Sequence, residues 1–183
     1  MEELATQGGE STRLQAGDVT TWEALYERVY PAMLAYAERR LGTRDEARDA
    51  VSEALTRAVA GVDRLAESGA VPEAWFFGIL RHVILDQHRR NYRHPKLSVT
   101  RDIVEEEPLE RIMIEEEGAA IRAAFDQLSE RDREVLELRV VAGLSSEETA
   151  CVLGMRPGAV RMAQARALAR LRTILVDTEQ ALA

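Results

Sequence analysis

Aromatic residues are scarce in this chain of 183 residues, of which only 5% are Phe, Trp or Tyr. Ala, Leu, Glu and Arg are abundant instead, and these residues favour helices over strands. The composition therefore predicts an all-α fold. A hydrophobic content of 46% is enough to bury one large helical core or the cores of two small helical domains.

Cysteine is nearly absent as well. The single Cys151 excludes a disulfide within the chain and any zinc site built from cysteines. Its position in an apolar helical pattern predicts a small buried side chain, and we assign it no chemistry.

Long apolar runs are also missing. The longest, near residues 112–114 and 140–144, are far too short to span a bilayer. The first residues, MEELATQGGE, lack the basic and then apolar layout of a signal peptide. We therefore expect a cytoplasmic protein that does not insert into a membrane.

The sequence contains no pattern typical of catalysis. It has no glycine-rich phosphate loop, no metal-ligand spacing, and no Ser or Cys nucleophile with a histidine partner. We therefore expect a protein that is not an enzyme and that needs neither a cofactor nor a metal.

The net charge of −8 would argue against nucleic-acid binding if the charge were spread evenly. It is not even. Residues 81–96 carry five basic residues against one acid, and residues 156–172 carry five arginines and no acid, whereas residues 102–117 are rich in acid. Two basic segments separated by an acidic one indicate two surfaces suited to nucleic acid.

Changes in composition divide the chain into four segments. They are a disordered leader (1–18), a helical bundle (19–94), an acidic linker (95–112) and a second helical domain (113–178).

Three helices are expected in the bundle. Hydroxyl-x-x-Glu capping boxes at residues 20–23 and 43–46 begin the first two, and Pro31 is expected to kink the first. Residues 67–70 are expected to form a loop. Pro72 then begins the third helix, because its missing N–H would be unpaired at that position anyway.

The second domain is expected to hold four helices. After a helix that starts near Met113, Ser129 caps the next one, and a third capping box at residues 145–148 opens a short helix. The last helix is expected from Pro157 to about Val176.

The stretch LSSEETACVLGMRPGAVRMAQARALARLR has the spacing of a helix-turn-helix. Ala150 is the small residue where the second helix crosses closely, Gly154 is the turn residue that tolerates a left-handed backbone, and Val160 is the apolar lock of the second helix. Leu153 and Met155 supply apolar contacts on either side of the turn.

Arg161, Met162, Ala165 and Arg166 then share the exposed face of the second helix. Arginine can fork onto guanine or grip a phosphate, so this face suits a DNA major groove. The alternative is an ordinary helical hairpin with a solvated basic face. Three spacing matches and the absence of acid from residues 156–172 favour DNA binding.

These motifs, together with two segments of the N-terminal bundle, resemble a known family. LSERDREVLELRVVAGLSSEETACVLGM and the helix after it resemble region 4 of extracytoplasmic-function (ECF) sigma factors. ARDAVSEALTRAV is similar to the family's helix that docks on the polymerase clamp, and EAWFFGILRHVILDQHRR is similar to its promoter-melting stretch. The resemblance covers residues 20–176.

The resemblance implies a sigma factor that binds core RNA polymerase and directs transcription initiation by reading the −10 and −35 elements of promoter DNA. The residues implied for the −35 element are Arg156, Gly158, Arg161, Met162, Ala165 and Arg166. Those implied for the −10 element and melting are Arg81, His82, Asp86, Arg89 and Arg90. Those implied for polymerase binding are Asp49, Ser52, Glu53 and Arg57.

Four of the chain's residues depart from the family's usual pattern. Ser52 replaces a common glutamine, His82 a usual asparagine, Thr149 a usual isoleucine, and Arg156 a usual serine cap before the recognition helix.

Strand opening requires pockets that catch unstacked bases beside positive charge. The loop at residues 65–72 and the basic face after it are the expected place. We interpret Trp75 and Phe76 as bundle core, and His82 and Asp86 as a surface pair rather than a metal site. The acidic runs are interpreted as solvated, although such a linker also suits a nucleic-acid mimic in a basic polymerase channel.

Two other functions compete with this interpretation. One is a free-standing helix-turn-helix regulator that dimerises through the N-terminal bundle, and the other is a helical enzyme that uses the carboxylate clusters. Two separate basic surfaces argue against the first, and the lack of Glu-x-x-His pairs argues against the second. The apolar and basic surfaces further predict an anti-sigma factor as a partner.

Overall fold

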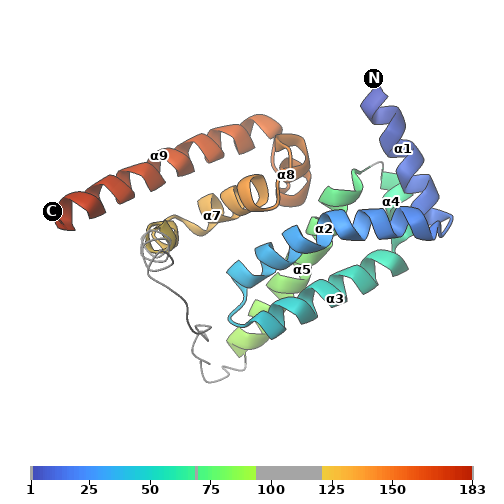
Figure 1. Cartoon of the computed structure of the whole chain (residues 1–183), viewed down its shortest axis with the longest axis horizontal. Helices are drawn as coiled ribbons and strands as arrows, with labels where there is room; N and C mark the ends of the chain where they lie inside the picture. Colours follow the sequence, from blue (N-terminus) through green and yellow to red (C-terminus); the bar gives the residue numbers. More distant parts are fainter. Residues whose placement is uncertain (1, 69, 94–120, 183) are drawn as a thin grey trace, which may run out of the picture.

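The computed structural model describes residues 2–68, 70–93 and 121–182. Every regular element in these ranges is a helix, as the composition predicted (Figure 1). The expected acidic linker at residues 95–112 lies outside the described residues, as does the expected helix start near Met113. None of the described helices is long and apolar enough to cross a lipid bilayer.

The N-terminal bundle is built on α2 (Val19–Arg40), α3 (Arg44–Ala60) and α5 (Pro72–Arg93). The buried face of α3 is made of small residues, so that α2 and α5 approach it closely. Its buried residues are Ala47, Ala50, Val51, Ala54 and Ala58. Larger side chains from the other two helices fill the core, among them Met33, Tyr36, Phe76, Phe77 and Leu80.

Helix starts agree with the expected signals at two of three places in the bundle. The Thr43 side chain accepts a hydrogen bond from the Glu46 N–H and caps α3, and α5 begins at Pro72. The expected capping box at residues 20–23 is wrong, because α2 begins at Val19 after Asp18 as its N-cap. Pro31 lies inside α2.

The first residues are not a disordered leader, which corrects the expectation for residues 1–18. Glu2–Gln15 form α1, which packs against α4 (Val62–Ser68) and α2. Leu14 is buried, and the Trp22 indole Nε1 donates a hydrogen bond to the Leu14 carbonyl over 3.0 Å. The buried Leu14, the indole contact and a 2.8 Å ion pair between Glu10 and Arg28 thus anchor a segment whose composition is otherwise polar.

The helix α4 also corrects the expected loop at residues 67–70, since it continues to Ser68. Its Leu65 is fully buried. Trp75 and Phe76 pack edge to face at 5.6 Å between ring centroids, and Phe76 is buried, which confirms the interpretation of the two rings as core.

The C-terminal part holds helical residues 121–126, then α7 (Glu130–Leu136), a π-helical turn η1 (Glu137–Val141), α8 (Ser146–Leu153) and α9 (Pro157–Leu182). The Ser129 side chain caps α7 by accepting from the Asp132 N–H, as expected. The helix α9 extends beyond the expected end at Val176.

The two halves of the chain share one apolar core. Leu138, Leu144 and Val152 of the C-terminal half pack with the buried residues of α2, α3 and α5. The helix α8 lies against α5, and η1 lies against α2. The C-terminal domain is thus docked on the bundle in this structure, an arrangement that no local sequence pattern indicated.

Candidate nucleic-acid interface

The turn of the helix-turn-helix has the geometry that its sequence predicted. Ser145 and Glu148 form a complete capping box at the start of α8. Gly154 ends α8 in the left-handed conformation, with φ 63° and ψ 36°, a region that favours glycine. The Met155 N–H donates to the Ala150 carbonyl over 2.9 Å and closes the turn.

The second helix of the motif is held in place by a small apolar cluster. Val160 and Ala163 of α9 are fully buried against Ala150 of α8 and Val135 of α7. Leu153 and Met155 pack against the same cluster. Ala150, Gly154 and Val160 therefore serve as the crossing residue, the turn residue and the lock that the sequence predicted.

Cys151 does not follow the expectation of a buried thiol. It is exposed on α8, whose buried residues are Ser146, Thr149, Ala150 and Val152. The apolar cluster and the bundle cover the other sides of this short helix, so that Cys151 lies on the side left to solvent.

The residues expected to face the −35 element lie together on the free face of α9. All of them are exposed: Arg156, Gly158, Arg161, Met162, Ala165 and Arg166. The guanidinium of Arg161 makes one contact in this region, with the exposed Glu147 carboxylate at 3.2 Å. A contact between two exposed side chains is weak, so Arg161 can leave it for another anion.

Arg139, which the sequence analysis did not identify, supports α9 on the side opposite the exposed face. Arg139 Nε donates to the Gln164 side-chain oxygen over 2.9 Å, and Arg139 Nη1 donates to the Leu144 carbonyl. Arg139 lies in η1, so the π-helical turn is tied directly to α9. No spacing rule could have identified this contact, because Arg139 and Gln164 are 25 positions apart.

The residues expected at the −10 element lie on α5, but their contacts differ from the expectation. His82 Nδ1 makes a 2.7 Å hydrogen bond to the Gly78 carbonyl, and Asp86 pairs with Arg89 at 3.1 Å. The expected pairing of His82 with Asp86 is therefore wrong. Arg89 and Arg90 are exposed.

The residues expected to contact polymerase form a strip along α3. Asp49, Ser52 and Arg57 are exposed and Glu53 is half-buried. Glu53 and Arg57 pair at 2.5 Å, one helical turn apart. Val59, in the next turn of α3, is also exposed, so the strip combines charge with an apolar end.

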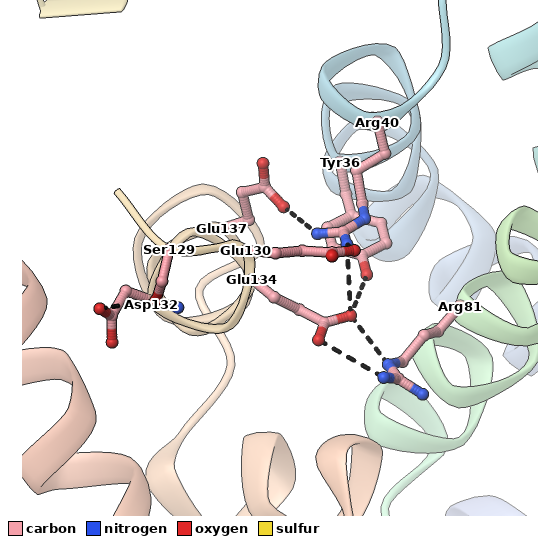
Figure 2. A network of polar contacts seen from close by, with 8 residues as sticks. All are labelled: Tyr36, Arg40, Arg81, Ser129, Glu130, Asp132, Glu134 and Glu137. Atoms are coloured by element: carbon pink, nitrogen blue, oxygen red, sulfur yellow. Dashed lines mark hydrogen bonds and ion pairs between the residues drawn. The ribbon is translucent and has the colours of Figure 1, made fainter. Parts of the chain in front are cut away.

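Arg81 differs from the other basic residues of α5 because it forms an ion pair with an acidic residue of the C-terminal half. Its Nε donates to Glu134 Oε1 over 2.8 Å, and its Nη2 donates to Glu134 Oε2 over 3.4 Å. Figure 2 shows Glu134, with Glu130 and Glu137 of the neighbouring turns, pointing toward Arg81, Arg40 and Tyr36.

The same acids contact two residues of α2. Arg40 Nη1 lies 2.7 Å from Glu137 Oε2, and Arg40 Nη2 lies 3.6 Å from Glu134 Oε1. The Tyr36 hydroxyl donates to Glu134 Oε1 over 3.4 Å. We call Tyr36, Arg40, Arg81, Glu134 and Glu137 the interdomain polar cluster. A hint of it lies in the sequence EVLEL, where two acids interrupt an otherwise apolar stretch.

Burial perturbs the titration of Tyr36, Arg40 and Glu137. Burial raises the pKa of Tyr36 well above its ordinary value, and the Glu134 and Glu137 charges add to this, whereas Arg40 opposes it. Burial also raises the pKa of Glu137, with Arg40 opposing the shift. Burial lowers the pKa of Arg40, but its interactions with Tyr36, Glu137 and Glu134 outweigh burial and leave that pKa raised.

Comparison with known proteins places the two halves of the chain in one family. The family model for sigma-70 region 2 matches residues 25–94, and that for sigma-70 region 4 matches residues 118–171. The ECF RNA polymerase sigma factor ShbA of Streptomyces griseus is 34% identical, over 94% of this chain and 97% of that protein. The ECF RNA polymerase sigma factor SigD of Mycobacterium tuberculosis is 32% identical, over 88% of this chain and 80% of that protein.

The chain belongs to the ECF RNA polymerase sigma factors. It is thus a DNA-binding initiation factor that directs RNA polymerase to promoters, as its sequence predicted. A free-standing helix-turn-helix regulator is not favoured, because the N-terminal bundle matches a sigma region rather than a dimerisation domain.

Solved structures of sigma factors have the same fold. The sigma factor RpoE of Bartonella quintana, solved with the anti-sigma factor NepR, aligns with a TM-score of 0.65 at 27% identity, over 86% of this chain and 98% of that one. CnrH, solved with the cytosolic domain of CnrY, aligns with the same TM-score of 0.65 at 22% identity, over 93% of this chain and 97% of that one, which supports the fold alone.

Proposed function

We propose that this sigma factor reads a promoter with two separate surfaces and meets polymerase with a third. In this proposal the exposed face of α9 contacts the −35 element, the basic face of α5 contacts the −10 element, and the strip on α3 docks on core RNA polymerase. The domains at residues 19–94 and 113–178 carry these roles.

The observation that carries the proposal is the free face of α9. All six residues expected at the −35 element are exposed there, on a helix whose opposite side is locked by Val160 and Ala163. A rigid helix with arginines on its free face fits the major groove, where guanidinium groups bind guanine edges and phosphates. Removing such a contact typically costs about 1–3 kcal/mol.

The charge distribution supports the need for polymerase. A net charge of −8 repels DNA at long range, so the isolated chain is expected to bind promoters weakly. Docking of the α3 strip on core polymerase would hold both DNA-reading surfaces beside the promoter and raise their effective concentration.

We also propose an anti-sigma factor as a partner and the cytoplasm, where core polymerase and promoter DNA meet, as the place of action. The relative RpoE of Bartonella quintana was solved with the anti-sigma factor NepR. A pull-down from the native host that recovers only polymerase subunits under every growth condition would contradict the anti-sigma proposal.

Transcription with core RNA polymerase tests the two surfaces separately. Templates with base changes in either the −10 or the −35 element are transcribed with the wild type, with the double variant Arg161→Ala/Arg166→Ala, and with Arg89→Ala/Arg90→Ala. The first variant is expected to lose its response to −35 changes but keep its response to −10 changes, and the second to do the reverse.

Arg172→Ala is the matched control for the −35 experiment. Arg172 is an exposed arginine of α9 outside the proposed face, so this variant should respond to both elements as the wild type does. A variant of the proposed face that kept the full response to −35 changes would contradict the proposal, as would a wild-type chain that formed no complex with core polymerase.

A further inference from the structure

We propose that the interdomain polar cluster is an autoinhibitory latch, in which Glu134 and Glu137 hold the C-terminal domain closed on the bundle and keep Arg81 from promoter DNA. The inference rests on the proposed function, because it takes Arg81 as part of the −10 surface. It adds a regulatory step that the chain carries in its own residues.

The interdomain polar cluster connects parts of the chain that a sigma factor uses as separate DNA-reading surfaces. Arg40 and Glu137 are 97 positions apart, and Arg81 and Glu134 are 53 apart. The acids come from α7 and η1, which lead into the helix-turn-helix, whereas their partners come from α2 and α5 of the bundle (Figure 2). Each contact is lost when the two domains separate.

The charged side chains of the cluster are buried. The side chain of Arg40 is 10% exposed, that of Glu134 is 10% exposed and that of Glu137 is 4% exposed. Charged groups are tolerated at such burial only when they are paired with good geometry, because desolvation is costly. The partners therefore hold each other in place, and breaking one contact leaves a buried charge without compensation.

Glu134 and promoter DNA compete for the same hydrogen-bond donors of Arg81. The carboxylate of Glu134 accepts from Nε and Nη2 of Arg81, the two-point geometry that a DNA phosphate also offers to arginine. The Tyr36 hydroxyl and the Arg40 guanidinium contact the same Glu134 carboxylate. An anion is therefore already bound where α5 and α2 meet. Promoter DNA cannot reach Arg81 until Glu134 leaves.

The latch is also connected to the recognition helix α9. Glu137 and Arg139 belong to the same π-helical turn, and Arg139 is bonded to Gln164 of α9. Release of Glu137 from Arg40 thus frees the element that supports the recognition helix. Opening would expose Arg81 and, in the same step, free the already exposed face of α9 to move with its own domain.

Distance measurement between spin labels tests closure without DNA. One label is placed on the exposed native Cys151 of α8 and one on a cysteine introduced at the exposed Ala60 of α3. The wild type should give a narrow distribution of label distances. The double variant Glu134→Gln/Glu137→Gln should give a broader distribution shifted to longer distances.

Affinity for promoter DNA tests the competition. If about a tenth of the wild-type chain is open, the double variant should bind a promoter duplex with an unpaired −10 segment about tenfold more tightly. The matched control is Glu130→Gln, a single change of the same kind on α7, because the Glu130 side chain is 76% exposed and lies 3.6 Å from Arg40 at the rim. This control should keep the wild-type distances and affinity.

A charge exchange guards against variants that merely unfold. Arg40→Glu should open the domains, and Arg40→Glu combined with Glu137→Arg should restore the short label distances, with circular dichroism reporting the helical content of each variant. Restored closure in the exchanged pair supports the latch. Unchanged distances in the Gln double variant, or open domains without tighter DNA binding, would overturn it.

These outcomes are separate from a failure of the proposed function. The label distances involve neither polymerase nor DNA, so they report on the latch alone. The proposed function fails instead if the wild-type chain does not support promoter-specific transcription by core polymerase, whatever the domains do in the free chain.

Discussion

Arg40 donates a 2.7 Å hydrogen bond to Glu137, and this contact joins the last turn of α2 to the π-helical turn that precedes the helix-turn-helix. The Arg40 guanidinium also lies over the Tyr36 ring at 5.5 Å from its centroid. A cation thus lies between a buried carboxylate and a buried phenol. These three groups add to the apolar contacts of Leu138 and Leu144 that join the two domains.

Tyr36 makes closure sensitive to alkaline pH. Burial raises its pKa above the ordinary 10.0, with Glu134 and Glu137 adding to the shift and Arg40 and Arg81 opposing it. The folded chain therefore keeps the phenol protonated where the unfolded chain loses the proton. This stability is fully present below about pH 10 and is lost progressively as the pH rises further.

Urea unfolding at a series of pH values between about 9 and 11 measures this loss. Tyr36→Phe should remove the part of the slope that begins near pH 10, whereas Tyr26→Phe, at an exposed tyrosine, should keep the wild-type slope. Lysine contributes little in this range, since Lys96 is the only lysine in the sequence, and Tyr26→Phe serves as the control for the other tyrosines. A Tyr36→Phe slope equal to that of the wild type would contradict the prediction.

Thr149 lowers the stability of the helix-turn-helix. It is fully buried in α8, and its Oγ1 has no hydrogen-bond partner among the described residues. A buried hydroxyl without a partner is costly, so Thr149→Val should raise the free energy of unfolding by about 1 kcal/mol. Thr149→Ser keeps the hydroxyl and loses a methyl group, and should be less stable than the wild type by a similar amount, about 1 kcal/mol. Equal stability of the Val and Ser variants in urea unfolding would refute the explanation.

Gly154 is required by the left-handed turn of the motif. An alanine there would adopt φ near +63°, so Gly154→Ala should lower the stability by about 1 kcal/mol. Gly158→Ala is the matched comparison, because Gly158 lies inside α9, and a Cβ there meets nothing within 4 Å. Helix propensity predicts a gain of up to about 1 kcal/mol for that variant. Thermal unfolding of the two variants should therefore move in opposite directions.

Asp49 is expected to contribute to polymerase binding through its position on the α3 strip. Asp49→Ala should weaken the complex with core RNA polymerase about tenfold, the effect of losing one charged hydrogen bond. Asp45→Ala removes the same charge from the same helix one turn before the strip, at a side chain that is 92% exposed, and should bind as the wild type does. Equal weakening by both substitutions would indicate a general charge effect rather than a contact.

The order of the helices and the form of the DNA-reading motif were already determined by the sequence, because they depend on contacts between near neighbours. The Ser145 capping box and the Gly154 turn each involve residues only a few positions apart, and the Val160 lock follows Ala150 by ten positions, in the next helix. The structure has all three. The wrong expectation for Cys151 had a tertiary cause. Cys151 is exposed because the bundle and the apolar cluster cover the other sides of α8.

Only the tertiary structure decided how the two domains meet. The apolar contacts of Leu138 and Leu144 with the bundle core, and the ion pairs of Glu134 and Glu137, join segments about half the chain apart, and no periodicity encodes such pairings. Helix α1 is similar, since a few specific contacts at Leu14 hold a segment whose polar composition predicted disorder. Propensity and spacing act over one or two turns of a helix, whereas burial of charge and docking of domains depend on which distant surfaces come into contact.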